Sequence, residues 1–140
     1  MLEETELLNF VRQNVEMGVD GVKLVIDDLD NADFSKELER ELCEYEKIYK
    51  EADALLEEIG GEKQDVKAAA KIAAHLSGKI KQLSGSTSKI AESMIQGSTM
   101  GTTKLIQHIN DYSGDGRVLK IAENLRKTEE NNIENLKKFL

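Results

Sequence analysis

The sequence contains no proline and no tryptophan, and aromatic residues make up only 4% of its 140 positions. The absence of proline permits long helices, because proline removes a backbone donor and clashes inside a helix. A single cysteine, Cys43, excludes an intramolecular disulfide, and a reducing cytoplasm is the expected location. No apolar run approaches the roughly 18 residues that cross a bilayer, so stable membrane insertion is not expected. The acidic first ten residues do not resemble a secretory signal.

Charged residues are plentiful, at 33% of the chain, and the net charge is −8. This acidic balance argues against nucleic acid as a partner. The charge is unevenly distributed: residues 1–61 hold 18 acidic and 6 basic side chains, whereas residues 62–110 hold 3 and 7. The basic middle can therefore complement the acidic first part, either within one chain or across a homodimer.

Apolar residues recur at intervals of three and four along most of the chain, which is the period of an α-helix. Asn31 or Asp33 is a candidate cap for the second helix, and Gly60 with Gly61 is a typical helix stop. The length favours one all-α domain spanning 1–140. We expect a four-helix bundle made of a hairpin (7–59), a long helical connector (62–85) and a second hairpin (87–140). The predicted helices cover 7–29, 34–59, 63–83, 87–111 and 118–139.

The segment QGSTMGTTK, residues 96–104, has the glycines, hydroxyls and lysine of a phosphate-binding loop. Its spacing differs from that of such a loop, no strand precedes it, and inside a helix its amides are already bonded. Nucleotide binding is therefore not expected. A glycine inside a helix costs about 1 kcal/mol relative to alanine. Close helix packing is the favoured explanation for Gly97 and Gly101 here, and for Gly18 in the first helix.

A weak internal repeat appears when the sequence is displaced by 83 residues. Met17-Gly18 then falls on Met100-Gly101, and Glu46 falls on Glu129. The breaks between the helices of the two hairpins also coincide. This match predicts a duplicated helical hairpin. The connector, if helical, would reach roughly 30 Å, which is about the length of the bundle.

A duplicated hairpin with a long connection, whose last helix carries the stretch KTEENNIENLKKFL, resembles the ferritin-like superfamily and especially its small rubrerythrin-like members. The resemblance implies a bundle in which each hairpin supplies a Glu from its first helix and a Glu-x-x-His from its second. In that family these six side chains hold two iron or manganese ions. Carboxylates neutralise the cations and each imidazole completes the coordination of one metal.

The family pattern falls here on side chains that have lost most of the expected ligands. Both histidines and both first-helix glutamates are replaced, and amides and a phenol can hydrogen-bond to the two glutamates that remain. We therefore expect a polar core network in place of the metal centre, with no catalytic residues and no cofactor. The six positions are Gln13, Glu46, Tyr49, Gln96, Glu129 and Asn132.

Three functional hypotheses follow. The first is a non-enzymatic protein that acts through its surface, with a homodimer as the expected oligomer. The second is an iron- or manganese-binding relative, active in metal oxidation, storage or peroxide detoxification, that uses shifted carboxylates. The third is an adaptor whose lysine-rich connector binds an acidic partner or membrane. His75, His108 and Cys43 have no sequence partners at metal-ligand spacing. The shifted carboxylates would be Glu16, Asp20, Glu92 and Glu123.

Overall fold

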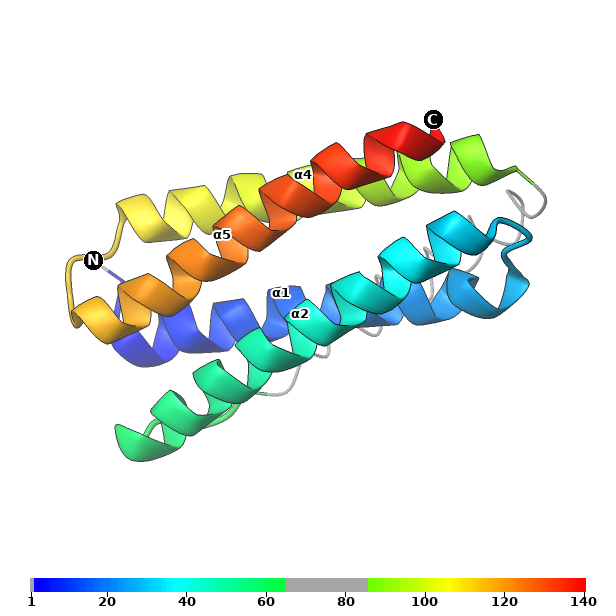
Figure 1. Ribbon diagram of the computed structural model, residues 1–140. Coiled ribbons are helices and arrows are strands. Elements are labelled where there is room, and N and C mark those ends of the chain that lie inside the picture. Colours follow the sequence, from blue (N-terminus) through cyan, green and yellow to red (C-terminus); the bar gives the residue numbers. More distant parts are fainter. Residues whose placement is uncertain (1, 65–85) are drawn as a thin grey trace.

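A computed structural model describes residues 2–64 and 86–140, which form four long helices (Figure 1). The 3₁₀ turns η1 (Ile26–Asp28) and η2 (Lys137–Phe139) extend the first and last helix, and no strand occurs in these two ranges. The predicted all-α class is confirmed for this part of the chain. The predicted helix over 63–83, with His75, lies almost wholly outside it. The long helices are α1 (Glu4–Val25), α2 (Ala32–Glu58), α4 (Thr87–Asn110) and α5 (Gly116–Leu136).

The ends of the helices follow local side-chain chemistry. The Asn31 side chain accepts a hydrogen bond from the Phe34 amide at 3.0 Å, so the predicted cap of α2 is confirmed. Gly60 ends α2 with a φ of 71°, a conformation that disfavours any side chain. Ser86 caps α4 and Asp115 caps α5 in the same way as Asn31 caps α2. The breaks between helices were therefore predictable from the sequence.

The helices pair as two antiparallel hairpins, α1 with α2 and α4 with α5 (Figure 1). α2 packs on α5 and α1 packs on α4, which joins the hairpins. α1 and α5 run in one direction along the bundle, and α2 and α4 run in the other (Figure 1). Each hairpin is thus antiparallel within itself, and α1 also contacts α5, which runs parallel to it.

The apolar core is divided into two clusters along the bundle axis. The larger one lies around Leu8, Ile48, Leu105 and Leu125, near the start of α1. The smaller one lies around Phe34 and the far ends of the helices. Between these clusters, every helix contributes polar or small residues instead of large apolar ones. Large exposed apolar side chains in the described ranges are restricted to Met100 and Leu140, and no helix there is long and apolar enough to cross a membrane.

Two of the three singled-out glycines lie where a side chain would collide with a neighbouring helix. A Cβ added at Gly18 would lie 2.7 Å from the Tyr45 ring, and one added at Gly101 would lie 2.9 Å from the Asn14 side chain. Gly97 differs, because it is exposed and a Cβ there would meet nothing within 4 Å. Within one chain, therefore, the expected close packing does not occur at Gly97 in the described residues. Gly97 lies on the outer face of α4, four residues from Gly101 but rotated away from α1.

Substituting alanine at Gly18 and at Gly97 should have opposite effects on stability. At Gly97 the better helix propensity of alanine should raise the free energy of unfolding by up to about 1 kcal/mol. At Gly18 the collision with a buried ring should instead lower it by about 1–3 kcal/mol. Urea unfolding followed by circular dichroism measures both changes. Equal effects at the two positions would contradict the packing described for Gly18.

Candidate functional site

A layer of buried polar side chains lies between the two apolar clusters, at the middle of the bundle. Glu41 from α2 is 1% exposed, Glu129 from α5 is 2% exposed, and Asn132 is fully buried. Thr102 from α4 is also buried, although its hydroxyl donates to the Ser98 carbonyl within its own helix. Ionisable groups are rarely buried this completely, because removing a charge from water is costly. This layer is therefore the candidate functional site.

Tyr45 and Glu129 form a direct bond between the two hairpins. The Tyr45 hydroxyl, buried on α2, donates to the Glu129 carboxylate on α5 at 2.9 Å. Burial raises the pKa of Glu129 to about 7, although hydrogen bonds from the hydroxyls of Tyr45 and Ser98 oppose that rise. Burial and the nearby glutamates also raise the pKa of Tyr45 well above its usual value. The phenol therefore acts as a donor, and Glu129 is close to half protonated at neutral pH.

Glu41 lies one helical turn before Tyr45 and carries a more strongly perturbed carboxyl group. Its pKa rises to about 9, first because of burial and next because of a side-chain hydrogen bond with Glu37. Two carboxyl groups can form a hydrogen bond only if one of them holds a proton. Glu41 is thus a neutral acid at neutral pH, and Glu37 is its hydrogen-bond acceptor.

Arg40 binds Glu37 and also reaches the second hairpin. Its guanidinium donates to both Glu37 oxygens, with the shortest contact at 2.8 Å, and to the Asn132 side-chain oxygen at 2.9 Å. The Arg40–Glu37 pair is the bidentate type that combines strength with fixed geometry. Asn132 therefore serves as an acceptor for α2 while lying on α5. The site is a network across the α2–α5 interface, formed by Glu37, Arg40, Glu41, Tyr45, Glu129 and Asn132.

The structure places only two of the six positions implied by the family pattern in this network. Glu129 and Asn132 are buried there, but Glu46 and Gln96 are exposed and Gln13 is half-buried at the side of α1. The expected polar core network around all six is therefore wrong for the first hairpin and for Gln96. The 83-residue offset aligns Glu46 with Glu129, whereas Tyr45, one residue earlier, is the side chain that faces Glu129.

Tyr49, the sixth position, belongs to a separate network between α1 and α2. Its hydroxyl donates to Glu16 at 3.0 Å and accepts from the buried Arg12 at 2.9 Å. Arg12 also forms an ion pair with Asp53 at 3.2 Å and donates to Asn9 at 3.0 Å. This network closes the first hairpin and does not reach the bundle centre.

The shifted carboxylates do not gather at one place. Glu16 accepts from Tyr49, and Asp20 lies exposed one turn later on α1. Glu92 is exposed on α4, and Glu123 on α5 lies 3.7 Å from Arg126. In the two described ranges, no group of three or more His, Cys, Asp or Glu side chains has an arrangement that could hold a metal ion.

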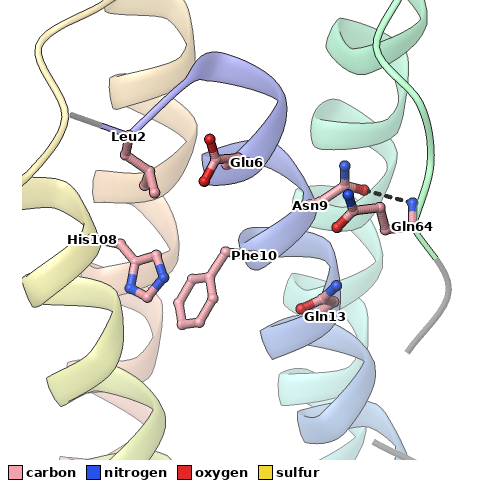
Figure 2. Close-up of a pocket in the computed structure, with 7 residues that line it drawn as sticks. All are labelled: Leu2, Glu6, Asn9, Phe10, Gln13, Gln64 and His108. Carbon is pink, nitrogen blue, oxygen red and sulfur yellow. Dashed lines mark hydrogen bonds between the residues drawn. The ribbon is translucent and has the colours of Figure 1, made fainter. Parts of the chain in front are cut away.

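Two shallow pockets lie on the sides of α1, away from the buried layer. One, of about 180 Å³, is lined by Gln13 and by the stacked rings of Phe10 and His108, which lie 3.8 Å apart (Figure 2). The side-chain oxygen of Asn9, at the edge of this pocket, accepts a hydrogen bond from the backbone N–H of Gln64 (Figure 2). This bond holds Gln64, which follows α2, against α1. The other, of about 410 Å³, lies between Val15, Val19 and Tyr49. Neither pocket contains a nucleophile with an evident base.

Sequence reasoning missed Glu41, Tyr45 and Arg40 as members of the site. Tyr45 fits the apolar stripe of the second helix, which describes its buried ring but not its hydroxyl. Glu41 occupies the same stripe, three residues after Leu38, yet the neighbouring Leu42 also fits the helical period. The sequence signal for Glu41 is a glutamate at a position of the apolar stripe, four residues after Glu37. Such a residue faces the core and is within reach of a second carboxyl group.

Comparisons of the chain with protein families, with curated proteins and with solved structures found no match.

Replacing Tyr45 with phenylalanine should destabilise the protein in a pH-dependent way. At pH 8 the buried Glu129 carboxylate loses its donor, which should lower the free energy of unfolding by about 1–3 kcal/mol. At pH 5 the loss should be smaller, because Glu129, with a pKa of about 7, is then protonated. Tyr112→Phe is the matched control, since the Tyr112 hydroxyl donates to a backbone carbonyl that does not titrate. An equal loss for Tyr45→Phe at both pH values would contradict the described role of Glu129.

Proposed function

We propose that this protein is a metal-free, ferritin-like helical bundle that acts as a structural or interaction protein and is not an enzyme. The observation that supports it most is the chemistry of the buried layer. Of its two deepest carboxyl groups, Glu41 is held as a neutral acid and Glu129 accepts a hydrogen bond from the tyrosine hydroxyl of Tyr45. A di-metal centre instead needs several ionised carboxylates and imidazoles directed at one point.

The surroundings of the layer also oppose a cation. The guanidinium of Arg40 lies beside the layer and donates to Asn132 at 2.9 Å. A positive charge therefore already lies next to Asn132, one of the positions where the family pattern places a metal ligand. The raised pKa values of Glu41 and Glu129 mean that these groups have little negative charge to offer below pH 7. The layer does not fit an iron or manganese pair, and the alternative of a metal centre built from shifted carboxylates has no cluster in the described ranges to support it.

The ferritin-like topology is part of this proposal. α2 and α4 run in the same direction, so a chain that joins them has to return along the length of the bundle (Figure 1). Asn9 accepts a hydrogen bond from the backbone N–H of Gln64, which places the last described residue after α2 next to α1. A connector over 62–85 accounts for this requirement. Its lysines, on which the adaptor hypothesis rests, lie outside the described residues except for Lys63, which pairs with Asp53 and Glu57.

A homodimer through the outer face of α4 is the proposed assembly. Most exposed side chains of α2 are charged, whereas the exposed face of α4 from Gln96 to Gln107 has a single charged residue, Lys104. Met100 lies in this face and is 63% exposed. Because the chain carries a net charge of −8, two copies repel each other least when they meet at an uncharged face. Gly97, which has free space around it, allows a second helix to approach closely.

Metal binding can be tested by thermal unfolding with and without Fe(II), Mn(II) or Zn(II). We expect an unchanged midpoint, because a metal that binds only the folded state would add about 2.7 kcal/mol of stability at 100 times its dissociation constant. Metal content after dialysis provides the second measurement, and the variant Glu41→Gln/Glu129→Gln is the control. Stoichiometric metal that is retained by the wild type and lost in this variant would overturn the metal-free assignment.

The proposed dimer can be tested by light scattering coupled to size-exclusion chromatography. The wild type should elute with twice the chain mass, and Met100→Lys should shift it toward the monomer by placing two like charges in the interface. Leu140→Lys is the matched control, because Leu140 is similarly exposed, at 60%, but lies at the end of the last helix. A monomeric wild type, or dissociation by Leu140→Lys alone, would reject the α4 interface.

A further inference from the structure

We propose that Glu41 is a proton-binding site through which pH controls the association of the two helical hairpins. The protonated acid belongs to the folded bundle, and its loss at alkaline pH loosens the α2–α5 interface. This regulation goes beyond the proposed structural role and does not depend on the oligomeric state.

The proposal begins from the position of Glu41 in the bundle. Its side chain is 1% exposed, and its Oε2 atom lies fully buried with no hydrogen-bond acceptor or donor assigned to it. It lies three residues after Leu38 and four before Tyr45, both of which are buried. An ionised carboxylate at this place would have neither water nor a dedicated cation around it.

The groups that face Glu41 favour the neutral acid. Glu37 and Tyr45 lie on its own helix, and Glu129 faces it from α5; both glutamates disfavour a second negative charge. Arg40 is the nearby cation, but its donors are directed to Glu37 and Asn132, and its attraction for Glu41 is weaker than the combined effect of burial and of Glu37. Ser98, the α4 side chain near this layer, is neutral.

The position of these groups explains why the proton affects the contact between hairpins. Arg40 is bonded to Asn132 and Tyr45 to Glu129, and both bonds join α2 to α5. A negative charge on Glu41 would compete with Glu37 for Arg40 and would repel Glu129 from the interface. Deprotonation therefore acts on both inter-hairpin bonds at once.

The direction of the pH effect follows from the folded and unfolded states. The pKa of Glu41 is about 9 in the folded protein and near its ordinary value of 4.5 in the unfolded chain, so unfolding releases a proton. The contribution of Glu41 to stability is complete below pH 4.5 and is lost as pH rises toward 9. Glu129 acts in the same direction, but over the narrower window from 4.5 to about 7.

The test is the pH dependence of the unfolding equilibrium constant, measured in urea between pH 7.5 and 8.5. In this window most Glu129 is already ionised, and release of the Glu41 proton should raise the constant about tenfold per pH unit in the wild type. In Glu41→Gln this tenfold slope should disappear, whatever the absolute stability of the variant. The exposed Glu46→Gln, on the same helix, should keep the wild-type slope.

A second measurement covers the case in which Glu41→Gln does not fold. Proton release on unfolding of the wild type at pH 8, measured in weakly buffered solution, should be about one proton per chain. Glu129→Gln should leave this value unchanged. It should reduce the pH dependence of the unfolding constant only between pH 5 and 7, where the contribution of Glu41 remains. Less than half a proton released by the wild type, or an identical slope in Glu41→Gln and wild type, would overturn the proposal.

Discussion

The contact between α2 and α5 depends on polar groups that are paired across the interface, one pair fully buried and the other partly buried. Tyr45 donates to Glu129, and Arg40 donates to Asn132, so each hairpin satisfies buried groups of the other. Apolar clusters on either side exclude water from these bonds. Buried polar groups cost free energy unless they are paired, so alternative registers of α2 against α5 are penalised. The apolar clusters favour association of the helices, and the polar layer selects one alignment.

Gly18 is a further part of this constraint. The Tyr45 ring occupies the space in which a side chain at position 18 would lie, so α1 can approach α2 at this height only with glycine. The ring in that position directs its hydroxyl at Glu129. A glycine on one helix, a phenol on the second and a carboxylate on a third are thus coupled. The same reasoning does not extend to Gly97, whose surroundings are open.

Sequence reasoning predicts the helices of this protein well and the site only in part. Asn31 and Gly60 act through local chemistry, so the limits of α2 were readable from a few neighbouring residues. Glu129 and Asn132 were singled out because a family pattern falls on them. Glu41 was missed because position 41 and position 42 both fit a helical stripe, and apolarity favours Leu42. Tertiary packing decides which of the two side chains faces the core, since rotating α2 about its axis by a fraction of a turn would bury Leu42 in place of Glu41.

The same rotation explains why the buried layer pairs a phenol with a carboxyl group across the two hairpins. With Glu46 turned to solvent and Tyr45 turned inward, the first hairpin presents to Glu129 a neutral donor and not a carboxylate. The most deeply buried carboxyl group on α2 lies a full turn before Tyr45, at Glu41, next to its own acceptor Glu37. Glu129 accepts a hydrogen bond from Tyr45, and Glu41 shares its proton with Glu37. Proton binding is the chemistry that this arrangement supports, because a proton can be held between one carboxyl oxygen and one acceptor oxygen.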